Sequence, residues 1–265
     1  MFIETHAHLN DQAFDADRDA VLDKCLAAGV DKLVEIACLP KDWPAGEKLA
    51  AAREGCVFCA FGLHPENLEE AGPERRAELP VWLQKKCCVA LGEIGLDYWW
   101  HPEQKEEQLK LLEDLLPLSV KFSKPVVFHT RNAKDVKAGD AYADLAAELK
   151  KWAFDNKKRA RGVLHCFSGS RKDAQAGLDL GLLLGVNGTF TYKNNWTLRE
   201  TVKMAGLQNI VLETDCPYLP VQGNRGKRND PSYIPEIARA AAEYLGVKTE
   251  ALAEATSATA AELFF

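Results

Sequence analysis

A short apolar, strand-like run recurs eight times along this chain, and this recurrence limits the possible folds most strongly. The runs cover residues 2–8, 32–38, 57–64, 89–97, 125–130, 162–167, 182–188 and 209–215. Segments with helical periodicity lie between them, for example residues 18–29, 102–122 and 171–181. Strands that alternate with helices of this length form a parallel sheet through right-handed crossovers. Eight such units are the number in a (β/α)8 barrel.

We therefore predict an α/β fold, a TIM-type (β/α)8 barrel in which residues 1–265 form a single domain with C-terminal helices. A chain of 265 residues suits one such barrel. The tail, residues 232–246 and 248–265, is expected to add two helices that cover the barrel or flank its mouth. An open doubly wound sheet is the competing architecture. Closure is favoured because no G-x-G-x-x-G follows the first run and no Walker A motif is present.

Composition and charge restrict the function classes. The chain has neither a signal-like start nor a stretch of roughly 20 apolar residues, so we expect a soluble, cytoplasmic protein without membrane contact. Its eight cysteines are expected to be reduced thiols, including the Cys56 to Cys59 pair in an apolar run. A net charge of -6 argues against a protein that coats nucleic acid. Any such contact would be local, at the basic segments 157–161 or 223–228, unless these are solvated faces.

We expect five of the eight strands to end on a histidine or an acid, residues that buried strands seldom carry without a partner. They are His6, His8, Glu93, His129, His165 and Asp215. In a parallel barrel the carboxyl ends of all strands open onto one face, so these side chains are expected to converge. His6 and His8 are two positions apart, which directs both side chains to one side of a strand.

The residue types point to a site for divalent metal ions. Four imidazoles and two carboxylates suit Zn or Mn better than Ca, and Mg, Mn and Zn remain the candidates. One catalytic ion normally takes three protein ligands, so six ligands predict two ions, with Glu93 as the bridge. Such a pair activates water for attack. We expect Glu93 and Asp215 to be the catalytic carboxylates, Asp215 also accepting the proton of the water.

Seven motifs resemble those of the TatD-type metal-dependent deoxyribonucleases, a family of the amidohydrolase superfamily. They are THAHL, GLHPE, GEIGLDY, FHTRNA, VLHCFSGS, ETDCPYL and RGKRNDP, in this order over nearly the whole chain. The resemblance implies a distorted barrel with His6, His8 and Asp215 on one ion, His129 and His165 on the other, and Glu93 between them. Ala7 and Asn10 stand where the family usually has Cys and Asp, but neither change removes a ligand.

Other motif residues are expected to contact the substrate, and each has a structural alternative. His64 can donate to a phosphate oxygen or cap a strand end. Arg131 can neutralise an anionic oxygen or pair with a nearby carboxylate. The loop residues Arg225, Lys227 and Arg228 suit a phosphate clamp, or else a solvated turn. The aromatic stretch at 98–101 can stack on a base or pack against a neighbouring loop.

The predicted function is hydrolysis of DNA phosphodiester bonds, in the form of a 3'-5' exonuclease. DNA is thus the expected partner, and a monomer is favoured. A binuclear site activates water for carbonyl attack equally well, so a hydrolase of small esters, lactones or amides is the first alternative, and a D-aminoacyl-tRNA deacylase is a second. A non-catalytic scaffold is disfavoured because all six ligands are present.

Overall fold

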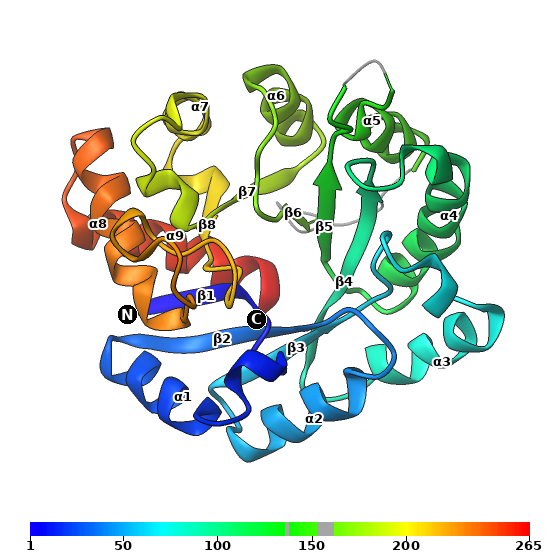
Figure 1. The fold of residues 1–265 in the computed structure, drawn as a ribbon, viewed down its shortest axis with the longest axis horizontal. Helices are drawn as coiled ribbons and strands as arrows, with labels where there is room; N and C mark the ends of the chain where they lie inside the picture. Colours follow the sequence, from blue (N-terminus) through cyan, green and yellow to red (C-terminus); the bar gives the residue numbers. More distant parts are fainter. Residues whose placement is uncertain (136–137, 153–161) are drawn as a thin grey trace.

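The computed structural model describes residues 1–135, 138–152 and 162–265. Eight parallel strands follow one another in sequence order through one sheet (Figure 1). They are β1 (Phe2–Ala7), β2 (Val30–Ala37), β3 (Val57–Phe61), β4 (Cys88–Asp97), β5 (Val126–Arg131), β6 (Gly162–Leu164), β7 (Leu182–Val186) and β8 (Ile210–Leu212). The predicted barrel is confirmed, and the basic segment 157–161 lies outside the described residues.

A short seam between β1 and the segment that follows β8 joins the two edges of the nearly closed barrel. Ala7 and Cys216 form an isolated parallel bridge. Beside it, the backbone N–H of His8 donates to the carbonyl of Cys216, and that of Asp215 donates to the carbonyl of His6, both at 2.9 Å. These bonds fix three of the predicted ligands against one another, so closure of the sheet also builds part of the site.

Helices surround the strands, and α1 to α8 each follow the strand of the same number (Figure 1). Their bounds are α1 (Arg18–Ala27), α2 (Trp43–Ala52), α3 (Pro73–Leu83), α4 (Lys105–Lys121), α5 (Ala141–Lys151), α6 (Arg171–Asp179), α7 (Trp196–Ala205), α8 (Ile234–Leu245) and α9 (Thr249–Phe264). In α4, Leu111, Leu112, Leu115 and Leu116 are buried because positions three and four apart share one face. That face packs on β4.

The additional helix α9 covers the floor of the barrel. Its residues Ala260, Leu263 and Phe264 form one buried cluster with inward-facing apolar side chains of the strands, such as Ile3 and Val211. The helix lies against β1 and β8. Because the amino-terminal end is sealed by apolar packing, the polar side chains gather at the opposite, carboxyl-terminal end.

Several strands are shorter than the apolar runs predicted. β6 ends at Leu164 and β8 at Leu212, so His165 and Asp215 lie in the segments that follow. His8 likewise follows β1, whereas Glu93 lies inside β4, which continues to Asp97. The expectation that these residues end their strands was therefore wrong in detail. Segments that turn away from the ladder, with Cys166 and Asp215 at positive φ, aim the side chains at the centre.

The tail forms the two predicted helices. None of the described helices is long and apolar enough to cross a membrane. All eight cysteines lie among the described residues, and each is a free thiol.

Candidate metal centre

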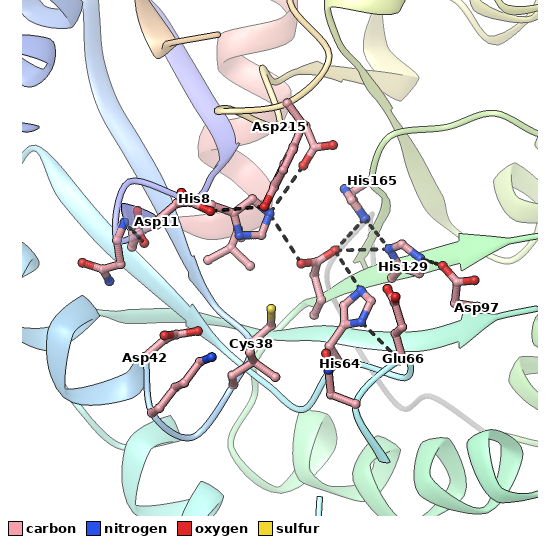
Figure 2. Close-up of a pocket in the computed structure, with 18 of the residues that line it drawn as sticks. His8, Asp11, Cys38, Asp42, His64, Glu66, Asp97, His129, His165 and Asp215 are labelled. Carbon is pink, nitrogen blue, oxygen red and sulfur yellow. Dashed lines mark hydrogen bonds and ion pairs between the residues drawn. The ribbon is translucent and has the colours of Figure 1, made fainter. Parts of the chain in front are cut away.

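The six predicted ligands come together at the carboxyl ends of the strands. Figure 2 shows His8, His129, His165 and Asp215 around the pocket. Their contributing segments are β1 for His6, the residue after β1 for His8, β4 for Glu93, β5 for His129, and the turns after β6 and β8 for His165 and Asp215. A cavity of about 810 Å³ opens above them, which we call the first chamber.

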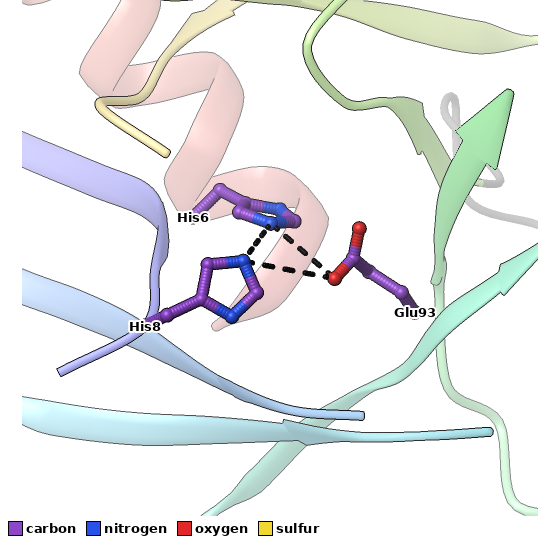
Figure 3. A group of neighbouring side chains, drawn as sticks. All are labelled: His6, His8 and Glu93. Carbon is purple, nitrogen blue, oxygen red and sulfur yellow. Dashed lines mark hydrogen bonds and ion pairs between the residues drawn. The ribbon is translucent and has the colours of Figure 1, made fainter. Parts of the chain in front are cut away.

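His6 and His8 direct their Nε2 atoms at the same point, 3.2 Å apart (Figure 3). Oε2 of Glu93 lies 3.7 Å from the His6 nitrogen and 3.8 Å from the His8 nitrogen. Oδ1 of Asp215 lies 3.6 Å and 3.4 Å from the same two nitrogens. Two nitrogens and two carboxylate oxygens therefore surround one point.

The other oxygen of Glu93 faces a second group of imidazoles. Oε1 lies 2.6 Å from Nε2 of His165 and 3.4 Å from Nδ1 of His129. These two nitrogens are 3.0 Å apart. The His64 Nε2 atom is farther away, at 4.0 Å from the same oxygen. Glu93 thus stands between two clusters, with one oxygen turned to each.

The imidazoles keep Glu93 ionised. Burial by itself favours the neutral acid, but the neighbouring His165 and His6 hold the pKa of this carboxyl well below its usual range. Burial lowers the pKa of His6 well below the ordinary imidazole value, which favours the neutral ring. Burial also lowers the pKa of His8, but Asp215 and Glu93 outweigh it and raise this pKa to about 9. Divalent metals bind ionised carboxylates and neutral imidazoles, so an ion held by His8 would displace a proton.

The spacing of these atoms fits a metal ion. Nitrogen and oxygen ligands lie about 2.0–2.1 Å from zinc, which puts the corners of a tetrahedral site about 3.3–3.4 Å apart. The five separations around the first point run from 3.2 Å to 3.8 Å. Overlapping trios that can hold an ion include His6, His8 and Glu93, and also His6, His165 and Asp215. The donor set therefore suits one or more divalent ions.

Asp97 was not identified from the sequence, although it belongs to the GEIGLDY motif. Its Oδ2 lies 2.8 Å from Nε2 of His129, and its Oδ1 accepts from the backbone N–H of Trp99 at 2.8 Å. Its side chain is 1% exposed. Burial lowers the pKa of His129, but the carboxylates of Asp97 and Glu93 outweigh it and raise this pKa to about 9, which favours protonation of both ring nitrogens. If an ion displaced the proton of Nδ1, the contact with Asp97 would keep the other proton on Nε2. The sequence did contain a signal for Asp97, because an acidic residue stands at the end of the fourth apolar run.

Three further buried glutamates position the turns that carry the ligands. Glu4 accepts from the backbone N–H groups of His6 and Thr214. Glu35 accepts from those of Leu9 and Asn10, and Glu213 from that of Cys166. Burial raises the pKa of Glu4 to about 8 and that of Glu35 to about 7. These acids were also missed, although Glu4 and Glu213 each stand two positions before a predicted ligand.

Close approach of β4 and β5 brings Glu93 and His129 together. Gly95 pairs with His129 in the sheet. It has a φ of +146°, and a Cβ at this position would collide with the carbonyl oxygen of His129. Only glycine permits this backbone and this distance.

His64 and Arg131, both predicted to contact substrate, line the first chamber. Nδ1 of His64 accepts from the backbone N–H of Glu66 at 3.2 Å, which leaves Nε2 as the donor that faces the centre. Burial lowers the pKa of His64 to about 3, so this ring is neutral. The guanidinium of Arg131 lies 4.5 Å from the ring centroid of Trp99.

The three predicted cations of the loop after β8 lie in different surroundings. Arg225 is exposed, with its guanidinium 4.8 Å from the ring centroid of Tyr192. Lys227 is also exposed. Arg228 forms a two-pronged ion pair with Asp17, at 2.7 Å and 2.6 Å, and also donates to the carbonyl of Ala13. The loop therefore does not act as one set of three cations.

The aromatic stretch after β4 is also divided. Tyr98 is fully buried, and the His101 ring pairs with Glu103 at 3.1 Å. Trp100 is 52% exposed and lines the first chamber. Lys134 lies 4.9 Å from the ring centroid of Trp100. Packing thus accounts for Tyr98, whereas Trp100 is accessible to a ligand.

Comparisons with known proteins agree in family and fold. A family model described as TatD related DNase matches residues 3–265. The chain is 30% identical to the uncharacterized metal-dependent hydrolase YabD of Bacillus subtilis, over 100% of this chain and 99% of that protein. It is 29% identical to the 3'-5' ssDNA/RNA exonuclease TatD of Pantoea ananatis, over 97% of this chain and 96% of that protein. The crystal structure of YjjV, a TatD homologue from Escherichia coli, matches with a TM-score of 0.89 and 30% identity, covering 99% of this chain and 97% of that one.

Proposed function

Because this chain belongs to the TatD-related DNase family of metal-dependent hydrolases, we propose that it removes nucleotides from the 3' end of single-stranded DNA. The relative from Pantoea ananatis carries the name of a 3'-5' exonuclease on single-stranded DNA and RNA. The proposed catalytic unit is a pair of divalent ions, Mg, Mn or Zn, held by the six clustered side chains.

One observation carries the two-ion proposal. The two oxygens of Glu93 face different groups of imidazoles, Oε2 toward His6 and His8 and Oε1 toward His129 and His165. A carboxylate in this position can bridge two ions. The shared negative charge would also reduce the repulsion between them.

Such ions supply polarisation of a phosphoryl oxygen and activation of water at neutral pH. The oxygen of the water would add to phosphorus, the bond from phosphorus to the leaving sugar oxygen would break, and that oxygen would take up a proton from the solvent. Asp215 is the proposed acceptor of the water's proton. Asp215 lines the first chamber and also a neighbouring cavity, so it can be reached from both.

His64 and Arg131 are proposed to hold the phosphate. The neutral His64 ring presents Nε2–H, 4.0 Å from Glu93, and can donate to a non-bridging oxygen. Arg131 supplies a positive charge to the wall of both cavities, and its stacking on Trp99 limits the orientations of the guanidinium. Charge-assisted bonds to phosphate are about twice as strong as neutral ones.

The test uses metal-stripped protein, to which Mg, Mn or Zn is added back. The substrate is single-stranded DNA labelled at the 5' end, so that stepwise loss from the 3' end gives a ladder of shortened labelled products. The Asp215→Asn variant is measured in parallel, together with a panel of small esters and lactones.

We expect added metal to restore cleavage by the wild-type protein and to give a ladder of shortened products. The Asp215→Asn variant should remain inactive. Unchanged turnover by Asp215→Asn would contradict its role as base. If only the small esters were hydrolysed, the proposed metal centre would stand, but DNA would not be its substrate.

A further inference from the structure

A second cavity of about 480 Å³ adjoins the first chamber, and we call it the second chamber. The residues that line both are His129, Arg131, His165, Asp215 and Tyr218. The metal centre therefore lies on the boundary between two spaces. A substrate that spans this boundary would place one part in each chamber and its reacting phosphate at the divide.

The two chambers differ in charge. Besides Glu93 and Asp215, five acidic residues line the first chamber, namely Asp11, Glu35, Asp42, Glu66 and Asp97. Lys41 adds one cation that does not line the second chamber, but the acids still outnumber it. Among the described residues that line the second chamber, Asp215 is the only acid. Apart from the residues that it shares with the first chamber, its polar lining is mainly hydroxyl and amide groups, such as Ser168, Asn195 and Thr197. A polyanion is therefore less strongly repelled by the second chamber.

Positive charge and an aromatic ring continue outward from the second chamber. Tyr192 forms part of its wall, and the Arg225 guanidinium lies 4.8 Å from the centroid of this ring. The next residue, Lys193, is exposed, and its backbone N–H donates to Gln222. An aromatic surface beside cations is the arrangement that proteins use to bind single-stranded nucleic acid.

The chemistry of a DNA end distinguishes the two sides of the cleaved bond. The terminal nucleoside carries no phosphate beyond the reacting one, and is otherwise neutral. The strand on the other side adds one negative charge with each nucleotide. An acidic chamber tolerates the first part better than the second, and the first chamber also offers the exposed Trp100 ring to a terminal base.

We propose that the second chamber, with Tyr192 and Arg225 at its outer side, holds the strand that remains after cleavage, while the first chamber receives the terminal nucleoside. This inference rests on the proposed function and adds the direction of the strand across the centre. Tyr192 would stack on a base, and Arg225 would contact a phosphate beyond the reacting one.

The experiment measures kcat/KM for single-stranded DNA from two to eight nucleotides long with the metal-loaded enzyme. The variants are Tyr192→Leu, which keeps apolar volume without a ring, and Arg225→Gln. The matched comparison is Trp100→Leu in the first chamber. In the wild type, kcat/KM should rise with length. One base stack corresponds to about a 5-fold to 150-fold effect.

Tyr192→Leu and Arg225→Gln should each lose most of the gain with length. Arg225→Gln should also reduce the slope of log(kcat/KM) against log[salt] by about 0.7, as one phosphate contact predicts. Trp100→Leu should change the preference for the terminal base while the gain with length remains.

The opposite pattern would overturn the inference. In that case Trp100→Leu would lose the rise of kcat/KM with length, whereas Tyr192→Leu and Arg225→Gln would keep it, and the strand would run in the reverse direction across the centre. A wild-type enzyme without a length gain would also overturn it. If the wild type degrades no oligonucleotide with any metal, the proposed function fails together with this inference.

Discussion

Replacing Asp97 by Asn tests whether this buried carboxylate prepares His129 to bind an ion. Asp97 accepts two hydrogen bonds, from Nε2 of His129 and from the backbone N–H of Trp99, each at 2.8 Å. An asparagine has one acceptor oxygen and one NH2 donor, so it can maintain only one of these bonds. If its NH2 faces His129, the imidazole proton moves to Nδ1 and blocks the atom that faces Glu93.

The expected effect is a 10-fold to 100-fold loss of affinity for one ion, about 1.4–2.7 kcal/mol. This agrees with the cost of about 1.5–3 kcal/mol for removing a hydrogen bond to a charged group. Burial supports the upper part of this range, because the Asp97 side chain is 1% exposed and water cannot replace the lost partner.

The assay is competition between metal-stripped protein and a chromophoric chelator, with Zn or Mn as the titrant. Glu103→Gln is the matched control, because it also converts a carboxylate to an amide but lies at the surface beside His101. The control should bind as the wild type does. Affinities of Asp97→Asn within about threefold of the wild type, with an intact circular dichroism spectrum, would refute the positioning role.

Three further predictions concern the bridge, the barrel floor and the loop after β8. Glu93→Gln should lower the number of ions bound per chain, because it removes the shared charge; elemental analysis that still finds two would contradict the bridge. Phe264→Ala should destabilise the protein by about 3–5 kcal/mol, the usual cost of emptying a core site, while metal stoichiometry is unchanged; urea denaturation with metal analysis measures both, and a cost below about 1 kcal/mol would show that α9 does not seal the barrel. Arg228→Ala should cost no more than about 1 kcal/mol, because its partner Asp17 is at the surface, and should preserve the salt dependence of DNA cleavage; a shallower salt slope would instead make Arg228 a phosphate contact.

Local patterns were sufficient to predict the barrel and the six residues that the structure brings together as a candidate metal centre. Apolar runs show where a strand passes through the core, and parallel strands present their carboxyl ends on one face whatever lies between them. Histidines and acids near those ends could therefore be assigned to one site before any interatomic distance was known. The prediction for His6, His8 and Glu93 depended on this topological rule.

Only the tertiary structure decided how each side chain is used, because partners distant in sequence determine it. Asp97 contacts His129 since β4 and β5 are neighbours in register. Arg228 is separated from Arg225, three residues away, since Asp17 binds it across the fold. The two chambers and their different numbers of acidic residues arise from loops of different strands. Residue types along a chain define which groups can react, but the distances and solvent exclusion that control their pKa values and ligands exist only after packing.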